Sequence, residues 1–218
     1  MRTFQTPEPI TATVDVLSGN VTVIASDRTD TVVEVRPADE SKKGDVRAAE
    51  QTRIEFTAGT LTVTTPKNWR TYSPFAGNPT IEVTIEVPTG SRLNGSAAVG
   101  RITGTGEFGR CDLEIAAGDI SVERPRGPVT AKAAKGDIRI GEVSQGELRL
   151  ETSVGELEVG ISPGSAAHVE ADALHGTVHN RMGPVAGPHD TAETVRVFAR
   201  NCYGNIIVRQ AVSAQPAI

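Results

Sequence analysis

The sequence predicts an all-β protein, a parallel β-solenoid or β-helix with about 18–21 residues per coil. Three observations predict this fold. A glycine-led phrase recurs at nearly constant spacing, apolar and polar residues alternate between its recurrences, and small β-branched and aliphatic residues supply most of the apolar content. Aromatic residues make up only 4% of the chain, beside 22 Gly and 13 Pro, so we expect narrow, repetitive packing with frequent turns.

The first third of the chain is less regular, but its segments alternate in the same way. Six of them are typical of strands and begin at Ile10, Ser18, Thr31, Thr52, Gly59 and Ile81. Between them, Asp39 to Gln51 could form one short helix or an exposed loop. We expect residues 1–90 to be a β-rich capping region that is continuous with the solenoid and keeps it from stacking end to end.

Residues 91–218 are predicted to be the solenoid repeats. The phrase of Gly, polar, apolar and polar residues begins at Gly100, Gly118, Gly136, Gly155, Gly176 and Gly204, at intervals of 18, 18, 19, 21 and 28 residues. An antiparallel meander could also alternate, but stacked coils need the same phrase to return at the same phase. The recurring glycine is typical of a corner that needs a positive φ or a close backbone approach.

Alignment of the coils on this glycine predicts which side chains are neighbours, if the coils stack in chain order. Four residues before the glycine the column reads Ser96, Glu114, Lys132, Glu151, Asp172 and Arg200, and its middle alternates in sign, as neighbouring strands prefer. One residue after the glycine, Asp119, Asp137 and Glu156 stack. This acidic column is either a solvated face or a site for a cation or a basic partner.

Composition and charge argue against several functions. The formal net charge is −5 and both signs are mixed along the chain, so we expect no nucleic-acid binding. The first ten residues lack the features of a secretory signal, and no apolar run approaches the ~20 residues of a membrane span, so we expect a cytoplasmic protein with no membrane association. Cys111 and Cys202 fit no metal spacing and are expected to be free, buried thiols.

The sequence contains no catalytic, phosphate-binding or dinucleotide-binding motif, so we expect no cofactor and no metal. The least improbable acid/base group is Glu158, His179 and Arg139, because the alignment places Glu158 and His179 in adjacent coils. The alternative is an ordinary surface pair of a histidine with a neighbouring carboxylate.

An aromatic loop is the second candidate site. Trp69, Tyr72 and Phe75 recur at intervals of three within a long loop and could stack on a sugar or a partner. The alternative is that the loop folds back and closes the solenoid end with its rings.

Several phrases together carry a family resemblance: Phe4 to Ile10, Ala25 to Pro37, Lys135 to Ile140 and Tyr203 to Ile206. The chain resembles the bacterial β-strand-repeat family labelled "putative adhesin", a domain of unknown function, and is most similar to its leaderless actinobacterial members. The resemblance covers almost the whole chain. It implies a β-helical fold and identifies no binding residues.

Three functions remain open at this point. The first is a non-enzymatic β-helical scaffold or protein-interaction module, with an unknown protein partner or self-association, because a solenoid presents a regular charged face. The second is adhesin-like binding of a carbohydrate or surface polymer, with a glycan as ligand. The third, which the sequence favours least, is an enzyme acting on a small molecule or polysaccharide through Glu158, His179 and Arg139.

Overall fold

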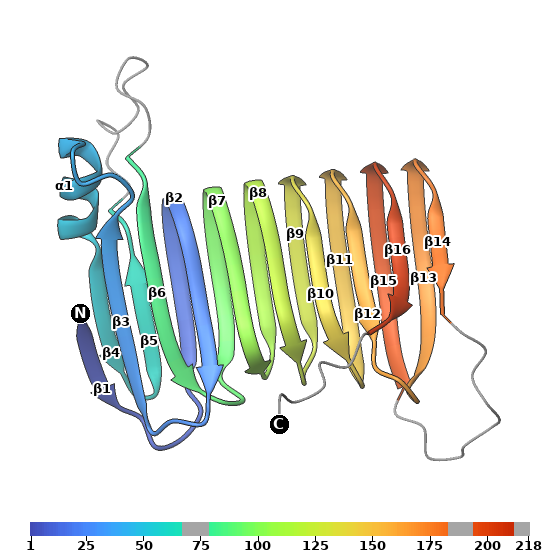
Figure 1. The fold of residues 1–218 in the computed structure, drawn as a ribbon, viewed down its shortest axis with the longest axis horizontal. Helices are drawn as coiled ribbons and strands as arrows, with labels where there is room; N and C mark the ends of the chain where they lie inside the picture. Colours follow the sequence, from blue (N-terminus) through green and yellow to red (C-terminus); the bar gives the residue numbers. More distant parts are fainter. Residues whose placement is uncertain (67–78, 183–193, 212–218) are drawn as a thin grey trace, which may run out of the picture.

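The computed structural model describes residues 1–66, 79–182 and 194–211, and these form one long stack of strands with a helix at one end (Figure 1). The predicted all-β solenoid is confirmed. The elements are β1 (Arg2–Gln5), β2 (Thr11–Ser26), β3 (Asp30–Pro37), α1 (Lys43–Gln51), β4 (Arg53–Thr57), β5 (Thr60–Thr64), β6 (Ile81–Pro88), β7 (Arg92–Phe108), β8 (Cys111–Pro125), β9 (Val129–Lys135), β10 (Ile138–Val143), β11 (Gly146–Val154), β12 (Leu157–Ile161), β13 (Ala166–His175), β14 (Val178–Arg181), β15 (Thr194–Tyr203) and β16 (Ile206–Gln210).

Each coil consists of one strand segment in each of two facing layers, joined at a corner. We call the layer with the order β4-β5-β2-β7-β8-β9-β11-β15-β13 sheet 1. Sheet 2 has the order β1-β3-β6-β2-β7-β8-β10-β12-β16-β14. The long strands β2, β7 and β8 bend through the corner and belong to both sheets. In both sheets, every pairing between β2 and the end of the stack at β13 and β14 is parallel, as stacked coils require.

The coils do not stack in chain order. The coil made of β15 and β16 lies between the coil of β11 and β12 and the coil of β13 and β14 (Figure 1). The first coil, β2, is likewise enclosed, between β5 and β6 on one side and β7 on the other. The expectation that successive repeats are neighbours is therefore wrong for the last two repeats.

The N-terminal end of the stack is closed by antiparallel strands and by α1. Strands β1 and β3 extend sheet 2, and β4 extends sheet 1. The rings of Phe4 and Phe56 stack with their centroids 5.2 Å apart, joining the outermost strands of the two sheets. Of the two alternatives for Asp39 to Gln51, the helix forms, from Lys43 onward. Strand β2 of the first region pairs with β7 of the second in both sheets, so the sheets continue from one region into the other. The division into residues 1–90 and 91–218 stays a prediction.

The core is a narrow apolar layer between the sheets. Alternate residues of each strand point into it, and Ile, Val, Leu and Ala supply nearly all of its fully buried side chains, with Phe108 as the largest. Two of its polar members, Thr152 and Asn201, donate hydrogen bonds to corner carbonyls, those of Gly136 (3.0 Å) and Gly155 (2.8 Å). No helix within the described ranges is long and apolar enough to cross a membrane.

The predicted glycine corners are confirmed, and their geometry shows why glycine is needed. The corner glycines stack directly on one another, coil upon coil, in the order Gly19, Gly100, Gly118, Gly136, Gly155, Gly204 and Gly176. At Gly136 φ is +144°, and a Cβ atom would lie 1.8 Å from the carbonyl oxygen of Gly118. Any side chain at this position would therefore force two coils apart.

Candidate functional site

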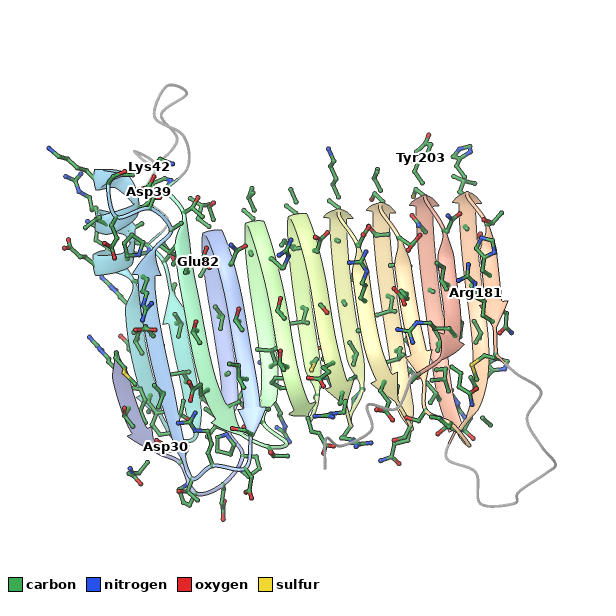
Figure 2. The ribbon with its side chains drawn as sticks, in the orientation of Figure 1. Asp30, Asp39, Lys42, Glu82, Arg181 and Tyr203 are labelled. Atoms are coloured by element: carbon green, nitrogen blue, oxygen red, sulfur yellow. The ribbon has the colours of Figure 1, made fainter. Side chains whose placement is uncertain are left out.

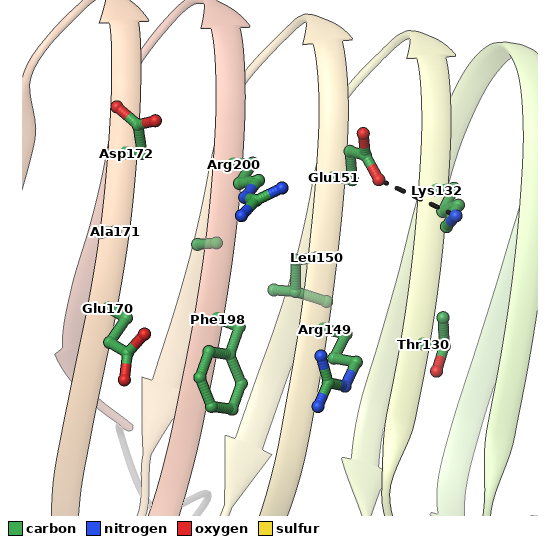
Figure 3. Close-up of a pocket in the computed structure, with 11 residues that line it drawn as sticks. Thr130, Lys132, Arg149, Leu150, Glu151, Glu170, Ala171, Asp172, Phe198 and Arg200 are labelled. Carbon is green, nitrogen blue, oxygen red and sulfur yellow. Dashed lines mark ion pairs between the residues drawn. The ribbon is translucent and has the colours of Figure 1, made fainter.

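The outward face of sheet 1 is hollowed along its length, and we call this hollow the sheet 1 trough. Its largest part, about 600 Å³, lies over β9, β11, β15 and β13 (Figure 3). Two further hollows of about 400 and 430 Å³ continue it toward β2, and Lys132 lines all three. Because the strands are parallel and in register, the side chains on this face form straight columns across the trough.

A column of alternating charge runs along the floor of the trough. In spatial order it reads Asp15, Ser96, Glu114, Lys132, Glu151, Arg200 and Asp172. The Lys132 ammonium lies 3.8 Å from the Glu151 carboxylate, and Arg200 stands in register between Glu151 and Asp172. The predicted alternation is confirmed. It extends further than chain order indicates, because the inserted strand β15 separates the acids of β11 and β13.

The C-terminal half of the trough contains an aromatic ring among charged groups. Phe198 is in register with Arg149 on one side and Glu170 on the other (Figure 3). The Arg149 guanidinium carbon lies 4.9 Å from the ring centroid, and its Nε donates to Glu147 at 2.6 Å. This part of the trough can contact an apolar group and form hydrogen bonds with groups of either charge.

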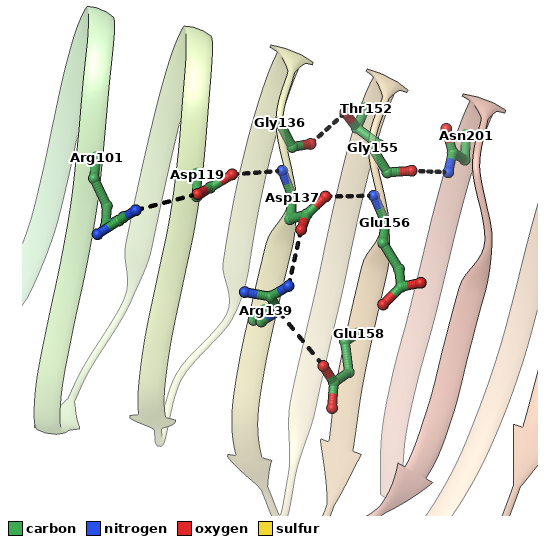
Figure 4. A network of polar contacts seen from close by, with 10 residues as sticks. All are labelled: Arg101, Asp119, Gly136, Asp137, Arg139, Thr152, Gly155, Glu156, Glu158 and Asn201. Atoms are coloured by element: carbon green, nitrogen blue, oxygen red, sulfur yellow. Dashed lines mark hydrogen bonds and ion pairs between the residues drawn. The ribbon is translucent and has the colours of Figure 1, made fainter.

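The acidic column on sheet 2 satisfies the backbone at the corners. Asp119 Oδ1 accepts a hydrogen bond from the Asp137 N–H at 3.0 Å, and Asp137 Oδ1 accepts one from the Glu156 N–H at 2.8 Å (Figure 4). Arg139 and Arg101 also lie beside these carboxylates, at 2.8 Å from Asp137 and 3.6 Å from Asp119. Among the described residues, no group of three or more His, Cys, Asp or Glu side chains is placed to hold a metal ion.

The predicted contact between Glu158 and His179 is wrong, because β16 lies between their strands. Glu158 is in register with Ile207, and Ile207 with His179. Glu158 instead accepts a hydrogen bond from Arg209 Nε at 2.6 Å. It also lies 3.6 Å from Arg139 Nε (Figure 4). The His179 Nε2 atom lies 2.9 Å from the Thr177 hydroxyl. The structure therefore brings together two members of the candidate acid/base group and separates the third.

The other candidate residues have separate locations. Trp69, Tyr72 and Phe75 lie outside the described residues, so their role stays a prediction. The expectation of two buried thiols is half wrong. Cys111 is buried and burial raises the pKa of its thiol to about 12, whereas Cys202 is exposed. Both are free.

Phe198 and Arg149 were not identified from the sequence. Phe198 is an outward residue of β15, and the outward residues on either side of it along the strand are Arg196 and Arg200. An aromatic residue between two outward arginines is the signal that could have indicated a site here. Nothing in the sequence around Arg149 indicates a binding site. Arg149 lies beside Phe198 only because β15 is inserted next to β11.

The chain is similar to one protein family and to several solved structures. A family model described as Toastrack DUF4097 matches residues 11–179. A solved structure described as a "putative cell adhesion protein" from Clostridium sporogenes is 13% identical, with 96% of this chain and 98% of that chain covered and a TM-score of 0.52. A "putative adhesin" from Bacteroides fragilis is 12% identical, covers 95% of each chain and has a TM-score of 0.42. No curated protein matches the chain.

Proposed function

We propose that this chain, which belongs to the Toastrack DUF4097 family, is a non-enzymatic β-helical scaffold that binds a protein partner in the sheet 1 trough. The observation that carries this proposal is the column of alternating charge across five adjacent strands, from Glu114 to Asp172. These side chains stand on rigid paired strands, so their spacing is fixed before a partner arrives. Preorganised charges of both signs select a complementary protein surface and penalise other surfaces.

The balance of charge in the trough supports a protein partner over a nucleic acid. Lys132, Arg149 and Arg200 are accompanied by Glu151, Glu170 and Asp172 along the same hollow. A polyphosphate backbone needs an excess of bases, whereas a protein surface offers acids and bases together.

The test is the capture of companions from host lysate, followed by size-exclusion chromatography with light scattering. We expect the unmodified protein to retain a protein companion at fixed stoichiometry. The variant Lys132→Glu/Arg200→Glu should lose it, because both trough bases become acids. The matched control Arg101→Glu/Arg139→Glu makes the same charge change on the outward face of sheet 2 and should keep the companion. Equal retention by the trough variant would refute the proposal.

A second candidate function is the binding of a carbohydrate, which the ring of Phe198 favours. An aromatic face beside the Arg149 guanidinium and the Glu170 carboxylate offers both stacking and hydrogen bonds to sugar hydroxyls. A glycan array probed with the unmodified protein and with Phe198→Ala distinguishes the two candidates. Binding of a glycan that Phe198→Ala abolishes, together with no retained protein companion, would favour this function over the first.

A further inference from the structure

The C-terminal end of the stack, formed by β13 and β14, presents a long free strand edge. Within the described part of the chain, β13 pairs with β15 alone and β14 with β16 alone. At the N-terminal end the outermost strands β1 and β4 are only 4 and 5 residues long, whereas β13 has 10. A free edge of this length offers a row of backbone N–H and C=O groups to another strand.

The apolar core is also incompletely covered at this end. The inward residues Val169 and Ala171 of β13 are only partly buried, although their partners in β15, Val197 and Ala199, are fully buried. Tyr203 projects past the strand ends at the same end of the molecule (Figure 2). On β14, Val178 is likewise exposed, although its partner in β16, Ile206, is fully buried. Apolar side chains that a further strand could cover mark an interaction surface.

The charges on the outward face of β13 determine how two such edges can pair. When two β13 strands pair antiparallel about a twofold axis, the axis passes either beside one residue of each strand or between two residues. Only in the first case do inward residues of one copy lie opposite inward residues of the other. A register centred on Glu170 places two carboxylates opposite each other, and one centred on Ala171 places Glu170 opposite Asp172. The register centred on Val169 sets His168 of each copy opposite Glu170 of the other and brings the two Val169 side chains together on the inward face.

We propose that two copies of this chain form a twofold dimer through their β13 edges, in the register centred on Val169. Sheet 1 then continues from one copy into the next, and the partly exposed inward residues of β13 are covered. The opposite end of the stack carries α1 and the short antiparallel strands, so the dimer closes and does not extend into a filament. This inference does not require a partner in the trough, although Glu170 of β13 also lines that hollow.

The decisive experiment is a charge exchange across the proposed contact, read out by light scattering. His168→Glu places two acids opposite each other twice in the dimer, and Glu170→Lys places a base opposite a base twice. Each variant alone should dimerise at least about tenfold more weakly than the unmodified protein. An equal mixture of the two should recover the dimer, because every pair across the interface is again acid with base. Failure of the mixture to recover would overturn the register.

A covalent readout tests the same contact without relying on charge. In a Cys202→Ser background, Val169→Cys places two thiols across the twofold axis, within reach of a disulfide. We expect mild oxidation to yield a covalent dimer, whereas the control Val197→Cys, one strand further inside, should yield none. Circular dichroism checks that both variants fold. An unmodified protein that remains monomeric at all concentrations, even if it binds another protein in the trough, would overturn the proposal.

Discussion

The stacked corner glycines make a quantitative prediction about stability. Gly136 has φ +144°, and a Cβ atom added there would lie 1.8 Å from the carbonyl oxygen of Gly118, well inside contact distance. Gly136→Ala therefore has to adopt an unfavourable φ and also to push its coil away from the preceding one. The second requirement arises because the obstacle is backbone, which cannot rotate aside as a side chain can.

The expected cost combines these two effects. Strain at a φ that only glycine adopts readily costs about 1–3 kcal/mol. Separation of the coils by more than an ångström weakens two or three ladder hydrogen bonds, each contributing about 1 kcal/mol. The sum is about 3–6 kcal/mol, a large part of the ~5–15 kcal/mol that stabilises a typical domain. At about 2–4 °C per kcal/mol for a chain of this size, we expect Tm to fall by on the order of 10 °C or more.

The assay is thermal and urea unfolding of Gly136→Ala beside a matched control. Gly59 also has a positive φ, +74°, but nothing lies within 4 Å of the position that its Cβ would occupy. Gly59→Ala should therefore cost about 1 kcal/mol, the strain alone. Equal destabilisation by the two substitutions would refute close contact between coils as the reason for the corner glycines.

Three further predictions concern single side chains. At pH 8 the native protein should consume one equivalent of a thiol reagent, at the exposed Cys202. Cys111 should react only after unfolding, because burial raises the pKa of its thiol to about 12. Rapid consumption of two equivalents by the native protein would contradict this. The Arg126 hydrogen bond lowers the pKa of Glu107. This pair therefore stabilises the fold above the unfolded pKa of about 4.3, and its contribution is lost as pH falls through the lower folded pKa. Because solvent reaches both side chains, the contribution is less than about 1 kcal/mol, and urea midpoints from pH 3 to 6 should depend less on pH in Glu107→Gln. Thr152→Val should lower the free energy of unfolding in urea by about 1–2 kcal/mol, because the Gly136 carbonyl loses its 3.0 Å hydrogen bond from the buried Thr152 hydroxyl. Thr152→Ser should retain that hydrogen bond and lower the free energy of unfolding less.

Much of the fold could be predicted because its signals are local and periodic. Alternation in each coil determines which side chains point inward, and the returning glycine determines where each coil turns. The glycine of the first coil, Gly19, escaped the alignment because the segment between β2 and β7 carries β3 to β6 and interrupts the period. Its place in the glycine column depends on pairing between strands distant in sequence.

The order of the coils could not be predicted from periodicity. The inward residues of β15, such as Val195 and Val197, fit beside β11 or beside β13 equally well, since all these strands share one alternation. The charge column contained a signal: chain order places Glu151 beside Asp172, whereas insertion of Arg200 between them restores alternation. The candidate group of Glu158 and His179 was wrong for the same reason, since the inserted coil separates them.

The enclosed position of residues 194–210 changes how the molecule resists force. In a solenoid stacked in chain order, tension on the chain beyond the last coil peels that coil from one neighbour, one hydrogen bond at a time. Here the segment under tension is held on both sides in both sheets, by β11 and β13 and by β12 and β14. An unfolding motor that pulls from this side therefore has to extract an interior coil before it reaches an outer one, and the stack yields as a block instead of unravelling.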